Sequence, residues 1–289
     1  MSTAPTEATI ERSSFGERVA GAVGRMGPLC AGIDPSGALL ADWALPDSVV
    51  GLREFCAVCV EAFAGTVPVI KPQVAFFERH GSAGLAELEE LIRQAQQAGL
   101  LVIVDAKRGD IDSTAEAYAD AWVGPQSPLA ADAVTVHPYL GLAALAPIIT
   151  LAGVTGRGVI VVVRSSNPEG RSLQQAVTAE GPSVEEALLA EIAAWNGGGT
   201  VPPGTVGAVV GATLPPSAFP LSQLGGVILA PGLGAQGARP HDVAERFAGC
   251  GAGTVLASTS RTLLSNGPDP ARLRKAAATL VGELSALMG

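Results

Sequence analysis

The chain alternates between short apolar runs and helical patterns, and this alternation limits the possible folds more than any other feature. Runs rich in β-branched residues occur eight times, at Leu29–Ile33, Val67–Ile70, Leu100–Val104, Ala133–Val136, Gly158–Val163, Val206–Val210, Val227–Leu229 and Thr254–Leu256. Most are separated by stretches with apolar residues at helical spacing, such as Ala86–Arg93, Glu185–Ile192 and Ala271–Leu287. Because strands that alternate with helices form parallel sheets, eight such units predict an α/β fold, a closed (β/α)8 TIM barrel in a single domain.

The length of the chain agrees with this prediction. At 289 residues it could hold two ordinary domains, but barrels of this kind typically use roughly 250 residues. The competing fold is an open doubly wound sheet, which we disfavour because the first strand–helix connection lacks a G-x-G-x-x-G fingerprint and no linker divides the chain. We expect a disordered leader over residues 1–12 and the barrel over residues 13–289, with a short helix at Phe15–Val23 before the first strand.

Composition and charge exclude several classes of function. With 48% hydrophobic and 16% charged residues, the chain can bury a large core. Its net charge of −9 argues against a nucleic-acid partner, because binding to phosphate backbones needs clustered Lys and Arg, although a small anionic substrate could still be held where a few cations converge. No apolar run approaches the ~20 residues of a membrane span, and the polar start has no apolar signal core. We therefore expect a soluble cytoplasmic protein without a membrane partner.

The cysteines do not predict a metal site. They are Cys30, Cys56, Cys59 and Cys250. Cys56 and Cys59 form a C-x-x-C motif inside the helical pattern Leu52–Cys59, but a second pair is absent and every histidine lies far away in sequence. We expect buried helical thiols, and zinc or redox chemistry is the alternative.

Charged side chains stand where several predicted strands end, which is where barrel enzymes place their chemistry. The first strand ends at Asp34, the second at Lys71, and the third leads into Asp105 and Lys107. Residues two apart on an extended segment point the same way, so Asp105 and Lys107 should lie side by side. Taken singly, Lys71 could be a solvent-facing lysine and Asp34 a turn former. Repeated charge at the ends of such apolar strands is hard to explain by folding alone.

The third strand continues into a tight turn and a helix. Gly109 permits the turn, Asp110 falls just ahead of the helix start, and Ser113–Glu116 resembles a capping box. Asp110 could therefore be only a helix cap, but its spacing from Asp105 and Lys107 favours a role in a site.

The last two strands are followed by residues that suit a phosphate group. A glycine-rich loop, Pro231–Gly237, follows the seventh strand, and Ser258–Arg261 follows the eighth. Barrels often hold a phosphate at this position through backbone N–H groups. Glycines that merely form turns and a surface arginine are the simpler alternatives, and only the joint position of the two segments favours the phosphate.

Several of these segments resemble the sequence motifs of a known enzyme family. From about Phe15 to the C-terminus the chain resembles the orotidine 5′-phosphate decarboxylase family, and in particular its longer bacterial (type 2) subgroup. The strongest matches are the segments Asp105–Ile111 (DAKRGDI) and Lys71–Glu78 (KPQVAFFE), supported by Pro138–Gly141 (PYLG) and Ser166–Pro168 (SNP). A bare D-x-K-x-x-D would be less specific, because phosphosugar decarboxylases and aldolases of the same superfamily also carry it.

The resemblance implies a function and a set of roles. Members of the family decarboxylate orotidine 5′-phosphate to uridine 5′-phosphate (UMP), the last step of de novo UMP synthesis, without metal or cofactor. They are homodimers with sites at the interface. By residue match, the catalytic array is Lys71, Asp105, Lys107 and Asp110. The matching substrate-binding residues are Asp34 for the ribose, Ser166 for the pyrimidine, Gln236, Arg261 and backbone around Gly234 and Gly237 for the phosphate, and Ile111 and Thr114, which with Asp110 would reach into the partner's site.

One local departure and two rival functions qualify the match. His137 stands where the family pattern has Asn, and we interpret it as a structural histidine. The enzymatic rival is a magnesium-dependent phosphosugar decarboxylase or hexulose-phosphate synthase, but these have an acidic metal ligand where this chain has Lys71, and an ammonium group cannot ligate magnesium. The rival from another class of function is a catalytically silent barrel that senses a nucleotide or phosphate. Only the completeness of the Lys/Asp array argues against this alternative.

Overall fold

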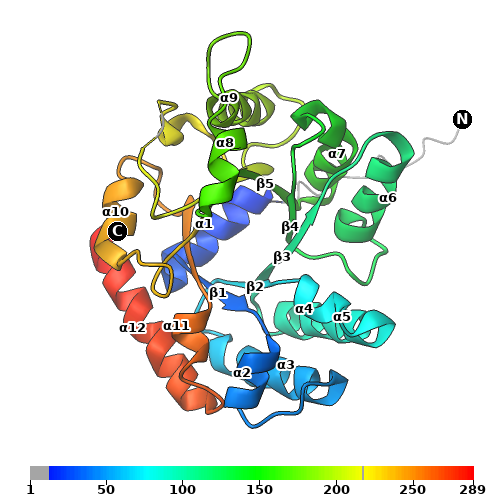
Figure 1. The fold of residues 1–289 in the computed structure, drawn as a ribbon, viewed down its shortest axis with the longest axis vertical. Helices are drawn as coiled ribbons and strands as arrows, with labels where there is room; N and C mark the ends of the chain where they lie inside the picture. Colours follow the sequence, from blue (N-terminus) through cyan, green and yellow to red (C-terminus); the bar gives the residue numbers. More distant parts are fainter. Residues whose placement is uncertain (1–12, 217) are drawn as a thin grey trace, which may run out of the picture.

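Eight parallel strands close into a barrel in chain order, with β1 pairing with both β2 and β8. The computed structural model describes residues 13–216 and 218–289 (Figure 1). The strands are β1 Leu29–Ile33, β2 Val69–Pro72, β3 Leu101–Arg108, β4 Ala133–Val136, β5 Gly158–Arg164, β6 Val206–Val210, β7 Ile228–Pro231 and β8 Val255–Thr259. The predicted (β/α)8 barrel is confirmed. The predicted leader, residues 1–12, lies outside the described residues.

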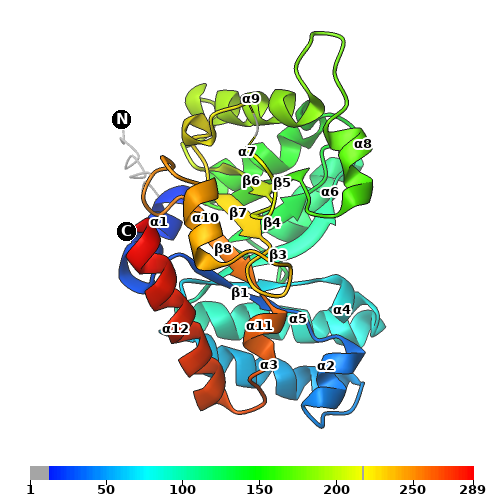
Figure 2. The same cartoon turned by 60° about the vertical axis from the view of Figure 1, so that its left-hand side comes forward.

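Helices surround the strands on all sides, as Figures 1 and 2 show. They are α1 Phe15–Met26, α2 Gly37–Asp42, α3 Val49–Phe63, α4 Ala75–Glu78, α5 Gly81–Gln97, α6 Asp112–Val123, α7 Ala146–Thr155, α8 Arg171–Gln174, α9 Val184–Gly197, α10 Pro240–Arg246, α11 Arg261–Leu264 and α12 Pro270–Met288. Short 3-10 turns lie at Leu142–Leu145, Pro168–Gly170 and Leu221–Gln223. In the described part of the chain, no helix combines the length and the apolar character needed to cross a membrane.

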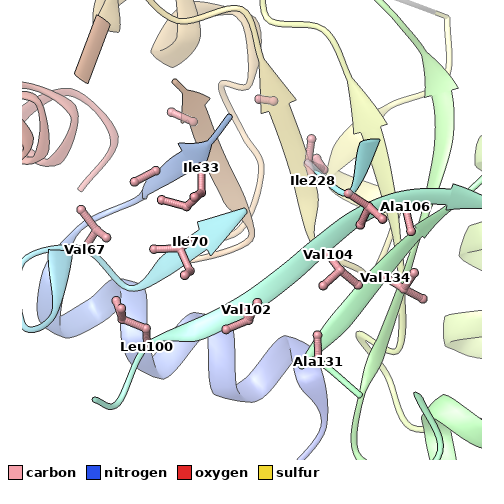
Figure 3. Packing of buried hydrophobic residues seen from close by; sticks show 14 of the residues in the cluster. Ile33, Val67, Ile70, Leu100, Val102, Val104, Ala106, Ala131, Val134 and Ile228 are labelled. Atoms are coloured by element: carbon pink, nitrogen blue, oxygen red, sulfur yellow. The ribbon is translucent and has the colours of Figure 1, made fainter. Parts of the chain in front are cut away.

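The core has two layers because side chains of a strand alternate between its two faces. The outer layer lies between strands and helices, and Figure 3 shows part of it, including Ile70, Val102 and Val134. The inner layer fills the barrel from residues such as Val69, Ile103 and Ile160. Helix α1 adds Phe15 and Val19 to this inner layer, both fully buried. The amino-terminal end of the barrel is therefore packed shut.

The C-x-x-C cysteines are structural. Cys56 and Cys59 are buried on α3 as free thiols, as predicted. Burial raises the pKa of both thiols, so neither is a reactive thiolate at neutral pH. Among the described residues, no group of three or more His, Cys, Asp or Glu side chains is arranged to hold a metal ion.

The predicted capping box at Ser113–Glu116 is wrong. Helix α6 begins at Asp112, one residue before Ser113, and its N-cap is Ile111 with no side-chain cap. The Ser113 hydroxyl therefore lies inside the first turn, where it cannot play the part of an N-cap. Asp110 precedes the cap and accepts the Ile111 N–H through its own Oδ1 at 2.8 Å.

Candidate active site

The inner face of the barrel changes from apolar to polar toward the carboxyl ends of the strands. On β2, buried Val69 is followed two residues later by Lys71. On β3, Ile103 is followed by Asp105 and then Lys107. Because every second residue faces inward, the same alternation that fills the barrel also delivers these charges to its mouth.

A cavity of about 260 Å³ opens at this mouth. The predicted site residues among its lining are Asp34, Lys71, Asp105, Lys107, Ser166, Gln236 and Arg261. They come from the ends of β1, β2, β3, β5, β7 and β8. Residues that are far apart in the sequence therefore converge on one cavity, as strand-end chemistry requires.

A larger hollow of about 880 Å³ lies near the opposite end, between α1, α10 and α12. Its lining is mostly small and apolar, and none of the described residues that line it is Asp or Glu. The charged array at the barrel mouth makes the smaller cavity the better candidate for chemistry.

Asp105 lies between two ammonium groups. Its Oδ2 is 2.9 Å from Lys71 Nζ, and its Oδ1 is 2.6 Å from Lys107 Nζ. Burial alone would raise the pKa of Asp105, but Lys71 and Lys107 outweigh it and hold that pKa well below its usual range. Burial would likewise lower the pKa of Lys71, but the charges of Asp105 and Asp34 outweigh this and raise it. Asp105 and Lys71 are therefore both charged at neutral pH.

Two further residues, which the sequence analysis missed, complete the contacts of Asp105. Gln73 donates its amide Nε2–H to Asp105 Oδ2 at 3.1 Å, and its Oε1 lies 3.5 Å from Lys107 Nζ. Thr135, fully buried on β4, donates its hydroxyl to Asp105 Oδ1 at 2.8 Å. The signal for both was the alternation itself: Gln73 lies two residues beyond Lys71, and Thr135 is the one hydroxyl in the run Ala133–Val136.

Lys107 has an unusual backbone. Its φ of +48° lies in the left-handed region, which costs a residue with a side chain on the order of 1–2 kcal/mol. The register between β3 and β4 shifts in the same place, between Val104 and Arg108. Irregularities of this kind often re-aim a side chain beside a site. Here the Lys107 ammonium group meets the Asp105 carboxylate in the cavity.

Asp34 brings an unpartnered oxygen to the cavity. Its Oδ1 is buried and has no hydrogen-bond partner among the described residues. A buried carboxylate oxygen without a donor is costly, so this atom is suited to accept a hydrogen bond from a bound hydroxyl. Ser260 Oγ, which also lines the cavity, is buried and unpartnered in the same way.

Apart from Asp34 and the Lys71, Asp105 and Lys107 array, the cavity lining is uncharged except for Arg261, which is exposed at the start of α11. Ser166 donates its hydroxyl to Gln236 Oε1 at 3.2 Å, so the loops after β5 and β7 touch there. Arg164, in contrast, turns away and is buried against Glu185 of α9 at 2.6 Å. The loops thus present polar groups and one cation to a ligand.

Gly234 and Gly237 shape the loop after β7 but do not line the cavity. The Gly234 N–H donates to the Ala238 carbonyl oxygen at 2.8 Å, and the Gly237 N–H donates to the Gly234 carbonyl oxygen at 2.7 Å. Gly234 has φ +79°, and a Cβ there would lie 2.1 Å from Thr262 Oγ1. These two amides are engaged within the turn, whereas Ala235 and Gln236 of the same loop do line the cavity.

Asp110, Ile111 and Thr114 lie outside the cavity of their own chain. They are on the connection from β3 to α6, where Ile111 and Thr114 are exposed. That connection packs tightly against the end of β4, since a Cβ on Gly109 would lie 2.5 Å from the His137 carbonyl oxygen. Burial and the charge of Lys107 lower the pKa of His137, which is therefore neutral at pH 7.

A (β/α)8 barrel with a Lys-Asp-Lys array and an arginine around the cavity at its mouth defines an enzyme for a small anionic substrate. Comparison with known proteins makes this specific. The sequence profile of the orotidine 5′-phosphate decarboxylase / HUMPS family matches residues 27–276, and the chain belongs to this family.

Relatives with high sequence identity are named for the decarboxylation of orotidine 5′-phosphate. An orotidine 5′-phosphate decarboxylase of Salinispora tropica is 50% identical over 275 residues, which cover 95% of this chain and 98% of the relative. One of Streptomyces coelicolor is 49% identical, covering 91% of this chain and 94% of the relative. A crystal structure of a Streptomyces avermitilis protein, provisionally assigned the same activity, has 46% identity and a TM-score of 0.92, with 99% of each chain covered. The Leishmania donovani OMP decarboxylase structure has 29% identity and a TM-score of 0.75, covering 95% of this chain and 99% of that one.

Proposed function

We propose that Lys71, Asp105 and Lys107, with Asp110 of the partner subunit, carry out the decarboxylation that defines this chain as a carboxy-lyase. The reaction converts orotidine 5′-phosphate to UMP and carbon dioxide in pyrimidine biosynthesis. The observation that supports these roles best is the position of Asp105 within 2.6 Å of Lys107 and 2.9 Å of Lys71 inside the cavity. It is this geometry that makes a charged array available to a reacting carbon.

The difficulty of removing carbon dioxide from the pyrimidine explains why a charged array is needed. Loss of carbon dioxide leaves a carbanion at C6 of the pyrimidine, which no adjacent carbonyl delocalises well, so electrostatic stabilisation has to lower much of the barrier. Lys107 stabilises this charge as an ammonium group and then donates its proton to C6. Asp105 orients Lys107 and, beside the substrate carboxylate, disfavours the bound carboxylate relative to the transition state.

Formal neutrality keeps the array ionised. The charges of two carboxylates and two ammonium groups sum to zero. Each pair of opposite charges at 4 Å attracts by about 4 kcal/mol at an effective dielectric constant near 20. The pKa of Asp105 is held low and that of Lys71 high, in keeping with two residues that stay charged while Lys107 gives up its proton. We propose that the chemistry needs neither a metal nor an organic cofactor.

The rest of the cavity suits the nucleotide. We propose that the unpartnered Asp34 oxygen accepts a ribose hydroxyl, that Ser166 contacts the pyrimidine, and that Gln236 and Arg261 bind the phosphate. Gly234 and Gly237 give the phosphate loop its shape, and any contact of their N–H groups with phosphate requires them to leave their present partners.

We further propose that the enzyme is a homodimer with shared sites. Asp110, Ile111 and Thr114 would complete the partner's cavity, since they do not line their own. Exposed apolar side chains on the neighbouring loops after β3 and β4, namely Ile111, Tyr139 and Leu140, support an interface there. A two-fold symmetric dimer would bury them on both chains.

We place the enzyme in the cytoplasm because its substrate and product are nucleotides, whose charge keeps them from crossing membranes unaided.

A single assay separates this function from its rivals. Purified enzyme should release carbon dioxide from orotidine 5′-phosphate at the same rate with and without EDTA, because Lys71 occupies the place where magnesium-dependent relatives have a metal ligand. Loss of the activity in EDTA and its return with Mg²⁺ would support a magnesium-dependent member of the family instead. Binding of the nucleotide without any release of carbon dioxide would indicate a silent sensor.

Arg261→Ala should lower kcat/KM by about 100-fold or more, corresponding to about 3 kcal/mol, although Arg261 is remote from the reacting carbon. The reason is that binding energy from the phosphate is used to organise the site as well as to retain the substrate. Steady-state kinetics measure the effect. Arg272→Ala is the matched control, since Arg272 is exposed on α12 and outside the cavity. Unchanged kinetics in Arg261→Ala would remove this residue from the site.

A further inference from the structure

Thr135 lies opposite an irregularity in the pairing of β3 with β4. Val104 pairs with Val134 and Arg108 pairs with Val136, so the three residues 105–107 of β3 face one residue of β4, which is Thr135. Regular ladder bonds cannot satisfy all the backbone groups of the longer segment at such an irregularity. The segment that bulges is the one that carries Asp105 and Lys107.

The Thr135 hydroxyl bridges this segment. It donates to Asp105 Oδ1 at 2.8 Å and accepts the backbone N–H of Lys107 at 3.0 Å. A hydroxyl has one donor and two acceptor lone pairs, so both bonds form at once. Thr135 has no exposed surface, and the other residues of its strand, Ala133, Val134 and Val136, are apolar. Valine has nearly the same shape, so the polar contacts are what distinguishes threonine at this position.

We propose that Thr135 is a positioning residue for the decarboxylation. Its hydroxyl fixes the orientation of the Asp105 carboxylate and replaces the missing ladder bond that holds Lys107 in its left-handed conformation. Both charged groups are then aimed before the substrate arrives. The inference rests on the proposed roles of Asp105 and Lys107, but it concerns a residue that does not itself line the cavity and acts through these two neighbours.

The effect should fall on turnover more than on binding. Removing the hydroxyl leaves the Lys107 N–H without its acceptor and deprives Asp105 of one of its four side-chain partners, Lys71, Gln73, Lys107 and Thr135. The carboxylate and the strained backbone can then shift, and small misplacements of catalytic groups cost large factors in rate. The phosphate, ribose and base contacts lie on other strands and stay in place.

The test compares three variants. Thr135→Val should lower kcat about 10- to 100-fold and leave the dissociation constant for UMP within about threefold of the wild type. Thr135→Ser, which keeps the hydroxyl, should restore most of kcat. Thr205→Val is the matched control: Thr205 is also buried and uses its hydroxyl once, toward the Pro202 carbonyl oxygen, far from the cavity. It should keep wild-type kcat at a comparable loss of thermal stability.

Three results would overturn the inference: wild-type kcat in Thr135→Val, equal loss in the Val and Ser variants, or equal loss in Thr205→Val. If Thr135→Val does not fold, Thr135→Cys replaces it, because a thiol is a poor donor and acceptor of similar size, and wild-type kcat there would count against the inference. Lys107→Ala is assayed in parallel. An active Lys107→Ala enzyme would contradict the proposed function, whereas an inactive one beside a fully active Thr135→Val would contradict only the role of Thr135.

Discussion

Lys107→Ala should abolish decarboxylation while the barrel stays folded. The side chain supplies the proposed proton to C6. Among the residues that the structure describes, no other ammonium group is placed to replace it, because Lys71 is already buried against Asp105. The Lys107 head group is partly exposed at the barrel mouth rather than packed in the core, so stability should change little. Release of carbon dioxide gives the activity, and thermal denaturation gives the stability.

Two controls make this result interpretable. Lys275→Ala removes an exposed lysine from α12 and should leave the rate unchanged. Lys107→Arg keeps a positive charge but cannot give up a proton at neutral pH, so it should bind UMP and remain inactive. Retention of more than a few per cent of wild-type activity in Lys107→Ala would rule out its role as proton donor.

Mixing two inactive chains should restore activity if Asp110 acts across the dimer. In a mixed dimer of Lys107→Ala and Asp110→Ala, one site collects both substitutions, whereas the other takes Lys107 from one chain and Asp110 from the other and is intact. With random exchange half of the dimers are mixed, so about a quarter of all sites should recover in a two-fold symmetric dimer. Each homodimer alone should recover none.

The mixing experiment needs proof of exchange. Native mass spectrometry of chains with different tags reports the share of mixed dimers, and the recovered rate should rise in proportion to it. Mixed dimers without any regained decarboxylation would mean that Asp110 acts within its own chain. Lys275→Ala mixed with wild type, which leaves both arrays and both cavities complete, controls for loss of activity caused by handling.

Much of the barrel could be predicted because its strands are runs of buried β-branched residues. β1, β4 and β6 have the predicted bounds, and the other strands differ mainly by running further toward their carboxyl ends. The extensions of β2, β3, β5 and β8 contain polar residues, which a search for hydrophobic runs does not detect. Lys71 and the Asp105/Lys107 segment lie within strands rather than after them, because neighbouring strands continue to pair there.

The details of the site depended on properties that no single segment encodes. The alternation could single out Thr135 as the one hydroxyl of its strand, but its contacts with Asp105 and Lys107 follow from the shifted register between β3 and β4, which depends on how two distant segments pair. The internal hydrogen bonds of Gly234 and Gly237 likewise follow from the closed turn rather than from glycine content. Asp110 lies outside its own cavity because the connection from β3 to α6 carries it away from the barrel mouth, which depends on where α6 begins.

Helix α1 closes the amino-terminal end of the barrel. Phe15 and Val19 fill the amino-terminal end, and the cavity at the other end opens onto Asp105. On the proposed roles, carbon dioxide would form beside Asp105 and would leave by the route that admits the nucleotide, passing the ligand or waiting for it to depart. Gas escape and nucleotide exchange therefore share one passage, and a ligand that fits the mouth tightly would delay both.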